Sequence, residues 1–582
     1  MSKISLPLVP VLLLSLAGSG PAMAQQAPTP EVAATPAGAP TSDDWTTWGY
    51  DQERTAWNRG EHTLGKANVS KLKVQWSTKL STPPTDVVLS TLTAPLVASG
   101  VTTPLGPKNL LFTLGADDVL FAIDADSGAV LWQKAFPNPI TARKNATWLC
   151  PNTANATPVI DKDKGVIYFM ASDGKLRGLG LSDGAERLTP IEMVAPFTRA
   201  WSLNLINDVV YTTSGRACGE VQDPKSAMAS AVAPFQRRAG ATTPAPTGPV
   251  VMTDPSAVTA VDVSDPANPQ LTRFYTSGGR PAGPWGRGGL ARGPGNSLIL
   301  ATSDGVYDPG AGSWGDTILK LTPKATRVAD SFTPENFKYI FAHDLAGSGS
   351  PVVFPFAGKT LVAVAQKEGV LYILDANDMG GGQARNHQQP VYKSPQLGND
   401  AAAGTDPSQG VWGGVTTWLS PEGRRYLYLP MWGPRSKDAP IFKNDGGAAP
   451  NGSIMAFEVV SDAAGKISVI PAWTSGNMIM PDPPVVANGV VYATQTGGQA
   501  AQNPTLPDGS RLNSATAASA KYRSTPVGNL ILYAFDAETG KQLYSSKNAI
   551  SDWTHFSEPV VAQGKVYLVT HDAHVYALGV RK

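Results

Sequence analysis

This chain of 582 residues is poor in charge and in cysteine. Charged residues make up 16% of it, and a formal net charge of +1 leaves no basic excess for nucleic acid or anionic membrane. It has two cysteines and no Cys-x-x-Cys-His, which excludes a c-type haem bound in the usual way. No later apolar run reaches the roughly 18 residues that a membrane-spanning helix needs. We therefore expect no nucleic acid partner, no haem and no membrane span.

Signatures of hydrolytic enzymes are also missing. The chain has no nucleophile elbow, no phosphate-binding loop and no carboxylate dyad, and its six histidines are scattered. Glycine (58 residues) and proline (50 residues), by contrast, together exceed the usual share of roughly 12%. This composition is typical of a weakly charged, turn-rich β protein.

The N-terminus has the pattern of a cleaved secretory signal. Lys3 precedes an apolar stretch, and Ala22-Met23-Ala24 precedes Gln25. A buried helix is the alternative, although two prolines interrupt the stretch. We expect a signal peptide over residues 1–24 and a disordered Pro/Ala-rich linker over residues 25–41. Since no lipobox cysteine follows, we expect a periplasmic or secreted protein.

One phrase recurs along the chain. Residues 119–132 read as an apolar strand, an Asp-x-x-Ser-Gly turn and a strand ending in tryptophan, and residues 530–544 repeat this with Thr-Gly and a final tyrosine. Each copy is typical of a β-hairpin whose glycine takes a positive φ. Weaker copies begin at Gly174, Gly369 and Gly452. Such a unit cannot bury its own faces, so the recurrence indicates a repeat fold.

A second element opens each unit, usually a proline or small residue before an apolar strand. The openings lie near Pro95, Pro158, Trp201, Leu290, Pro351, Val415, Pro484 and Pro559. This count predicts an all-β, eight-bladed β-propeller of four-stranded blades, forming a single domain over residues 42–582. The last unit lacks an outer strand, which residues 72–76 near the N-terminus supply. We expect that strand to close the ring and remove its open edges.

Two long segments interrupt the repeats. Residues 221–250 and 496–529 are rich in Ala, Pro, Ser, Thr and Gly and fall in blades three and seven. We expect surface loops that cover a channel mouth or are disordered. Cys150 and Cys218 lie near adjacent blades, and an oxidising compartment favours a disulfide between them. Two separate buried thiols and a catalytic thiol are the alternatives.

The repeat phrase, the opening from Trp45 to Trp76 and the segment from Gln366 to Asp375 resemble the pyrroloquinoline quinone (PQQ) repeat family. The chain is most similar to the propeller of quinoprotein alcohol dehydrogenases, over about residues 43 to 580. The resemblance implies an eight-bladed propeller that binds PQQ with a calcium or lanthanide ion. It also implies oxidation of an alcohol, with electrons passing to a separate acceptor.

The resemblance assigns roles to particular residues. Lys367 matches the lysine that contacts the quinone oxygens, and Trp412 matches a tryptophan beside the cofactor. Asp304 stands at a metal-ligand position, Glu220 reaches another after a shift of three residues, and Asp316 stands as the counterpart of the catalytic base. Ordinary turn residues would also explain Lys367 and Asp304, and Asp316 aligns more naturally with a serine of the family pattern.

Three departures from the family pattern favour a different interpretation. Val411 replaces an asparagine, Ala217 stands where the metal-binding glutamate is expected, and Leu290-Ala291 stand where a tryptophan would form the floor of the quinone site. Two hypotheses therefore remain. The protein is a soluble quinoprotein dehydrogenase with an altered site, or a non-catalytic propeller that binds a periplasmic protein partner.

Overall fold

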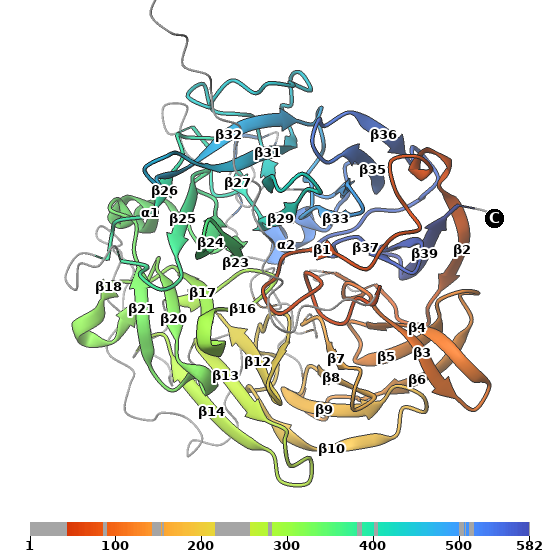
Figure 1. The fold of residues 1–582 in the computed structure, drawn as a ribbon. Coiled ribbons are helices and arrows are strands. Elements are labelled where there is room, and N and C mark those ends of the chain that lie inside the picture. Colours follow the sequence, from red (N-terminus) through yellow and green to blue (C-terminus); the bar gives the residue numbers. More distant parts are fainter. Residues whose placement is uncertain are drawn as a thin grey trace, which may run out of the picture.

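The computed structural model describes residues 43–84, 90–141, 150, 153, 156–215, 256–277, 282–380, 387–400, 406–499, 506, 508–510, 512 and 517–580. Within this part of the chain the strands form eight sheets of at least four strands, arranged around one axis (Figure 1). The eight-bladed β-propeller predicted from the sequence is confirmed.

Each blade is an antiparallel sheet whose first strand lies nearest the axis. Blade 1 contains β3 (Leu96–Thr103), β4 (Gly106–Leu114), β5 (Val119–Asp124) and β6 (Val130–Ala135), and blade 2 contains β7 (Val159–Asp161), β8 (Val166–Met170), β9 (Lys175–Gly180) and β10 (Glu186–Glu192). Blade 3 contains β11 (Asn204–Ile206), β12 (Val209–Ser214), β13 (Ala257–Asp262) and β14 (Gln270–Tyr275). Blade 4 contains β15 (Gly283–Pro284), β16 (Ala291–Arg292), β17 (Leu298–Ser303), β20 (Ile318–Leu321) and β21 (Val328–Phe332). Blade 5 contains β23 (Val352–Phe356), β24 (Lys359–Ala365), β25 (Leu371–Asp375) and β26 (Tyr392–Lys393). Blade 6 contains β27 (Gly410–Val411), β29 (Thr416–Leu419), β30 (Arg425–Trp432), β31 (Gly452–Ser461) and β32 (Ile467–Thr474). Blade 7 contains β33 (Val485–Ala487), β34 (Val490–Gln495), β35 (Ile531–Asp536) and β36 (Gln542–Ser545), and blade 8 contains β37 (Val560–Ala562), β38 (Lys565–Val569), β39 (His574–Gly579) and β2 (Lys73–Lys79).

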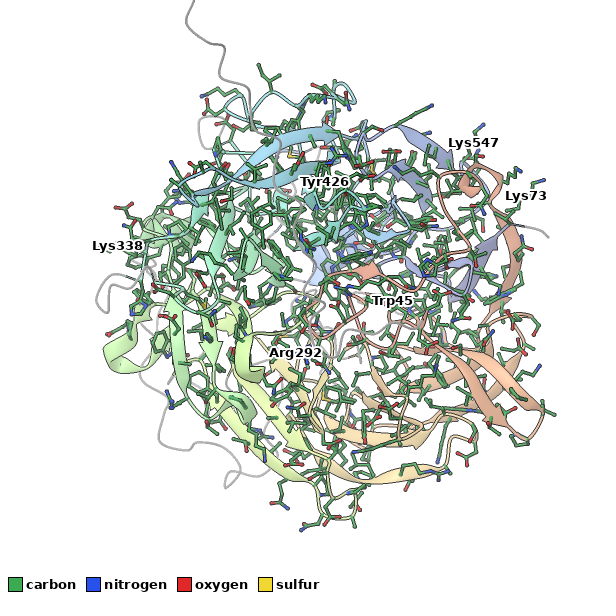
Figure 2. The ribbon with its side chains drawn as sticks, in the orientation of Figure 1. Trp45, Lys73, Arg292, Lys338, Tyr426 and Lys547 are labelled. Atoms are coloured by element: carbon green, nitrogen blue, oxygen red, sulfur yellow. The ribbon has the colours of Figure 1, made fainter. Side chains whose placement is uncertain are left out.

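Short elements complete the described fold. They are the strands β1 (Trp57–Asn58), β18 (Tyr307–Asp308), β19 (Ser313–Trp314), β22 (Gly349–Ser350) and β28 (Gly413–Gly414), the helices α1 (Phe337–His343) and α2 (Ala517–Arg523), and the 3-10 turns η1 (Val69–Lys71), η2 (Pro294–Asn296), η3 (Pro309–Ala311) and η4 (Pro323–Ala325). No helix in the described ranges is long and apolar enough to cross a membrane. Buried side chains fill the space between neighbouring sheets (Figure 2).

Two parts of the sequence 500 residues apart close the ring. β2 pairs antiparallel with β39, with Lys73 opposite Gly579 and Lys79 opposite His574. β2 is the outermost strand of blade 8, although it precedes blade 1 in the chain (Figure 1). The predicted closure by an N-terminal strand is therefore confirmed. It leaves no blade with an unfilled outer position.

The recurring phrase encodes a specific turn. Asp124 Oδ1 accepts hydrogen bonds from the N–H groups of Asp126 and Ser127, and Gly128 follows with a φ of 79°. In the last copy, Asp536 Oδ1 accepts from two N–H groups in the same way, and Gly540 has a φ of 70°. The aspartate stabilises the turn and the glycine allows its left-handed residue, which explains why both recur.

The tryptophan at the end of the phrase binds the next blade. Trp76 donates its indole N–H to the carbonyl of Ala125 in blade 1, and Trp132 donates to Leu181 in blade 2. A Cβ atom built on Gly128 would lie 2.7 Å from the Trp76 ring. The glycine therefore serves a second purpose, because only a residue without a side chain lets the tryptophan stack on the turn.

The N-terminal segment of residues 45–58 makes an inner ring that the sequence did not reveal. It bonds in order to the innermost strands of all eight blades, through the residue pairs Trp45–Val97, Thr46–Ile160, Gln52–Asn204, Gln52–Arg292, Glu53–Val353, Thr55–Thr417, Ala56–Val486 and Asn58–Val561. β1, at its end, adds a parallel strand inside blade 7. One short segment thus contacts every blade at the axis.

Arg54 holds this inner ring in shape. Its guanidinium is 1% exposed and donates to the carbonyls of Leu290, Trp48 and Leu203 and to the hydroxyl of Thr47, at 2.7 to 3.0 Å. Burial lowers the pKa of Arg54 to about 9, so it remains charged at neutral pH. The charge is stabilised by these carbonyl dipoles, of which those of Leu290 and Leu203 also accept hydrogen bonds from Asn204 and Thr47.

We expect substitution of the turn glycine Gly128 to destabilise the protein more than substitution of Gly358, although both have a positive φ. Gly128→Ala should lower the free energy of unfolding by about 2 to 4 kcal/mol, because it combines a left-handed residue with overpacking against Trp76. Gly358→Ala is the matched control, since Gly358 has a φ of 74° and no atom within 4 Å of its Cβ position. It should cost only about 1 kcal/mol. Urea unfolding of both variants checks this, and equal losses would contradict the tryptophan contact.

We expect Arg54→Met to destabilise the whole propeller. It removes four hydrogen bonds of a buried charge and leaves the Trp48 carbonyl without a donor among the described residues, so the free energy of unfolding should fall by about 3 to 5 kcal/mol. Arg187→Met removes an exposed ion pair with Asp183 and should change stability by less than about 0.5 kcal/mol. Chemical denaturation followed by circular dichroism distinguishes the two, and a loss below 1 kcal/mol for Arg54→Met would refute the role of the inner ring.

Candidate functional site

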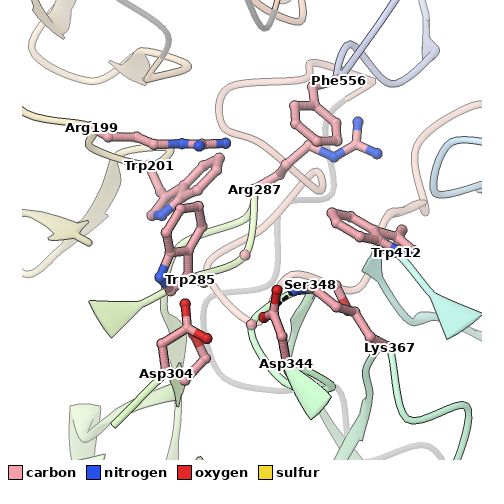
Figure 3. A pocket seen from close by; sticks show the side chains of 13 residues that line it. Arg199, Trp201, Trp285, Arg287, Asp304, Asp344, Ser348, Lys367, Trp412 and Phe556 are labelled. Carbon is pink, nitrogen blue, oxygen red and sulfur yellow. Dashed lines mark hydrogen bonds and ion pairs between the residues drawn. The ribbon is translucent and has the colours of Figure 1, made fainter. Parts of the chain in front are cut away.

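A cavity opens where the inner ends of several blades meet. Its empty volume is about 480 Å³, including the part open to solvent. The residues that line it come from blades 3 to 6 and from blade 8, and they are Arg199, Trp201, Trp285, Gly286, Arg287, Ser303, Asp304, Asp344, Gly347, Ser348, Lys367, Trp412 and Phe556. Figure 3 shows the larger side chains arranged around a common gap. We call this space the central cavity.

Aromatic rings form two opposite walls of the central cavity (Figure 3). Trp201 and Trp285 lie together on one side, with ring centroids 5.4 Å apart. On the other side Trp412 stacks on the fully buried Trp432 at 4.6 Å and an interplanar angle of 9°, with Phe556 next to it. These walls are rigid because both pairs are packed in the core. They suit a flat, conjugated ligand.

Three cationic side chains reach the same space. Arg199 lies over the rings of Trp201 and Trp285, at 4.7 and 4.5 Å from their centroids. Arg287 lies 4.3 Å from the centroid of Phe556, and Lys367 Nζ lies 5.4 Å from that of Trp412. Each cation is therefore fixed against an aromatic wall, a contact that stabilises it when water is excluded. The arrangement favours a ligand with several negative charges.

Carboxylates lie at the base of the central cavity (Figure 3). Asp344, in the left-handed position after α1, accepts a hydrogen bond from Lys367 Nζ at 2.8 Å. Asp304 also lines the cavity, whereas Asp316 lies behind it, where its Oδ1 accepts the N–H of Asp304 at 3.1 Å. Burial, with the charges of Asp304 and Asp344, raises the pKa of Asp316 well above its usual range.

The structure brings three of the predicted site residues together. Lys367, Trp412 and Asp304 all line the central cavity, and Lys367 and Trp412 are in contact there. Asp316 lines a separate small cavity between blades 4 and 5, so its assignment as base stays a prediction. Glu220 lies outside the described residues.

The structure describes only one of the two cysteines of the predicted disulfide. Cys150 is described and is not a free thiol, while Cys218 lies outside the described residues. Their pairing stays a prediction. The first predicted insert, residues 221–250, also lies outside the described part of the chain, whereas the second lies between β34 and β35 and places α2 near the axis (Figure 1).

Sequence reasoning missed much of the cavity wall, including Arg199, Arg287, Asp344 and Phe556. These residues stand in connections between blades, where the repeat gives no periodic signal. Trp285 stands three residues before Gly288 and lines the cavity, whereas the family pattern placed a tryptophan after Gly289. A useful signal was available, because tryptophan and arginine in glycine-rich connections near the axis have few other functions.

The family resemblance implied two bound groups, PQQ and a calcium or lanthanide ion, and the residues around the central cavity fit the first of them. Aromatic walls and three cations suit the flat tricarboxylate PQQ, and the buried indole N–H of Trp201 has no acceptor within the described ranges. A metal centre is not formed by the described residues, since no group of three or more His, Cys, Asp or Glu side chains among them could hold an ion. The site therefore fits PQQ, and the described side chains do not by themselves fit calcium or a lanthanide.

Comparison with known proteins agrees with the fold. Residues 67–215 match the PQQ_2 family, described as outer membrane protein assembly factor BamB. No curated protein matches the chain. Its structure is similar to that of quinohemoprotein alcohol dehydrogenase from Comamonas testosteroni, at 15% identity, a TM-score of 0.53 and coverage of 94% of this chain and 82% of that one.

A europium-containing methanol dehydrogenase is also similar, at 14% identity, a TM-score of 0.54 and coverage of 92% of this chain and 89% of that one. A second quinohemoprotein alcohol dehydrogenase, from Pseudomonas putida HK5, has 13% identity and a TM-score of 0.51, with coverage of 92% and 80%. Identities this low support a shared fold and no more. The chain is thus an eight-bladed β-propeller whose residues 67–215 match the PQQ_2 family and whose fold resembles that of the quinoprotein alcohol dehydrogenases.

Proposed function

We propose that this protein binds PQQ in the central cavity and acts as an exported quinoprotein. The observation that carries the proposal is the placement of three cations, Arg199, Arg287 and Lys367, against opposed aromatic walls in one cavity. A desolvated tricarboxylate needs cationic partners, and a flat quinone needs aromatic faces. Few other ligands require both in one enclosed space.

The bound quinone would supply the two-electron oxidation of an alcohol, with a separate acceptor taking the electrons. The protein's own contribution is to orient the ligand between Trp285 and Trp412 and to keep Lys367 near its oxygens. Asp304 and Asp344 are the carboxylates positioned to hold a substrate proton at the cavity wall, because Asp316 lies behind it. Of the two, Asp344 would hold the proton in contact with Lys367 Nζ.

We further propose that a calcium or lanthanide ion binds beside PQQ. Asp304 is the described residue best placed to ligate one, and further oxygen ligands would have to come from PQQ or from residues such as Glu220. The binding measurements below therefore compare PQQ affinity with and without these ions.

A second candidate function is a non-catalytic propeller that binds a protein partner. Its support is the internal pairing of the cavity cations, since Lys367 contacts Asp344 and Arg287 contacts Asp482 and Glu558. Paired cations stabilise a cavity that has no ligand. Failure of PQQ to bind would favour this alternative and direct the search to periplasmic proteins.

We expect PQQ to quench the fluorescence of the 14 tryptophans saturably, at micromolar concentration or below. Lys367→Ala should weaken binding at least about tenfold, because it removes a cation and leaves Asp344 uncompensated beside the ligand. Lys338→Ala is the control, since Lys338 is an exposed residue of α1 at the outer rim (Figure 2). The titration is run with and without calcium and lanthanum, and with Asp304→Asn to test the metal assignment. Equal affinities for the Lys367 and Lys338 variants would exclude the assigned site.

We expect the tryptophan wall to contribute separately. Trp285→Leu should weaken PQQ binding by about threefold to tenfold, since ring stacking is worth about 0.5 to 1.5 kcal/mol beyond the buried area. Trp132→Leu removes a tryptophan from the outer strand β6, remote from the central cavity, and should leave the dissociation constant unchanged. Calorimetric titration measures both, and an unaffected Trp285 variant would place the ligand elsewhere.

A further inference from the structure

A buried ionic cluster adjoins the central cavity at the axis. Arg287 Nη2 lies 2.6 Å from Asp482 Oδ1, and Arg287 Nη1 lies 2.9 Å from Glu558 Oε1. Trp48 donates its indole N–H to Glu558 Oε2 at 2.6 Å. The three charged side chains are 6%, 1% and 7% exposed, in the order Arg287, Asp482, Glu558. We call these four residues the axial cluster, which joins the inner ring to blades 4, 7 and 8.

The axial cluster has one more carboxyl than it has cations. If both carboxyls were ionised, it would carry a net negative charge out of contact with water, which is costly. Asp482 Oδ2 accepts no hydrogen bond from the described residues, so negative charge on that oxygen is uncompensated and a proton there would neutralise it. Burial raises the pKa of both Asp482 and Glu558 against the opposing effect of Arg287.

Other charged groups nearby act on a different residue. His555 is buried, and burial together with the charges of Arg523, Arg287, Arg199 and His571 lowers its pKa well below the usual range. His555 is therefore neutral at physiological pH and supplies no charge to the carboxyls. Arg287 is the cation that faces both of them, so its charge decides how many protons the pair keeps.

Arg287 also connects the axial cluster to the ligand site. It lines the central cavity and a second cavity of about 350 Å³. Trp201 and Phe556 line both cavities, and Trp48 lines the second. An anion bound in the central cavity would therefore compete with Asp482 and Glu558 for one guanidinium. Weakening that attraction raises the affinity of the carboxyls for protons.

We propose that Asp482 and Glu558 share one proton in the free protein, and that a polycarboxylate bound against Arg287 makes the axial cluster take up a further proton. The inference rests on the proposed function for its ligand, PQQ. It makes ligand affinity fall as pH rises, because the proton taken up becomes scarcer. Anion binding at Arg287 is thus linked to protonation of Asp482 and Glu558.

The shared proton is tested without any ligand. Infrared spectra of the full-length free protein at neutral pH should contain a protonated-carboxyl stretching band that Asp482→Asn or Glu558→Gln removes. Asp262→Asn is the control, since Lys324 and Ser264 lower the pKa of Asp262 to about 2 and keep it ionised. A spectrum that neither cluster variant changes would overturn the shared proton.

The coupling is tested by calorimetric titration with PQQ in two buffers of different ionisation enthalpy. Wild type should take up about one proton per PQQ bound, and Glu558→Gln should take up close to none. Binding without proton uptake contradicts the coupling while leaving the proposed function intact. Absence of any PQQ binding overturns both the proposed function and the coupling, and the infrared result alone decides the shared proton.

Discussion

The hydrogen bonds between the inner ring of residues 45–58 and all eight blades are the constraint on which this structure depends. Blades contact only their neighbours through side-chain packing, so a ring of eight has no intrinsic means of fixing its centre. The inner ring fixes the centre by bonding to every blade. Its residues Tyr50, Arg54 and Ala56 have left-handed backbone conformations that turn the chain round the axis. Because the same segment continues into β2, one stretch of sequence fixes both the innermost contacts and the outermost strand of blade 8.

The central cavity owes its walls to the same geometry. Gly288 has no side chain because a Cβ atom there would lie 2.4 Å from the Trp48 ring of the inner ring. The residues after the glycines, Leu290 and Ala291, pack in the core of blade 4, and the Leu290 carbonyl accepts from Arg54. A tryptophan at that position would have no space. Trp285, before the glycines, lines the central cavity instead.

The sequence predicted the fold well because its signals are local. Each Asp-x-x-Ser/Thr-Gly phrase folds into its own turn, and each tryptophan contacts a neighbouring copy, so counting copies counts blades. The site was predicted only where a residue follows a recognisable strand, as Lys367 does after β24. Arg199 and Phe556 could not be found in this way, since three-dimensional closure rather than any local pattern brings their connections together. Asp316 was assigned as the counterpart of the catalytic base from the family pattern alone; it lies behind the cavity wall, and its role stays a prediction.

The pairing of the cavity cations determines what kind of selectivity the site can have. Lys367 and Arg287 are already balanced by Asp344, Asp482 and Glu558, so an entering anion gains only the difference between the old contacts and the new. Charge alone therefore gives little affinity, and a small anion such as phosphate gains almost nothing. A ligand with a large aromatic surface gains the stacking that these internal pairs cannot supply. For the proposed ligand PQQ, stacking on the aromatic walls would therefore supply most of the selectivity.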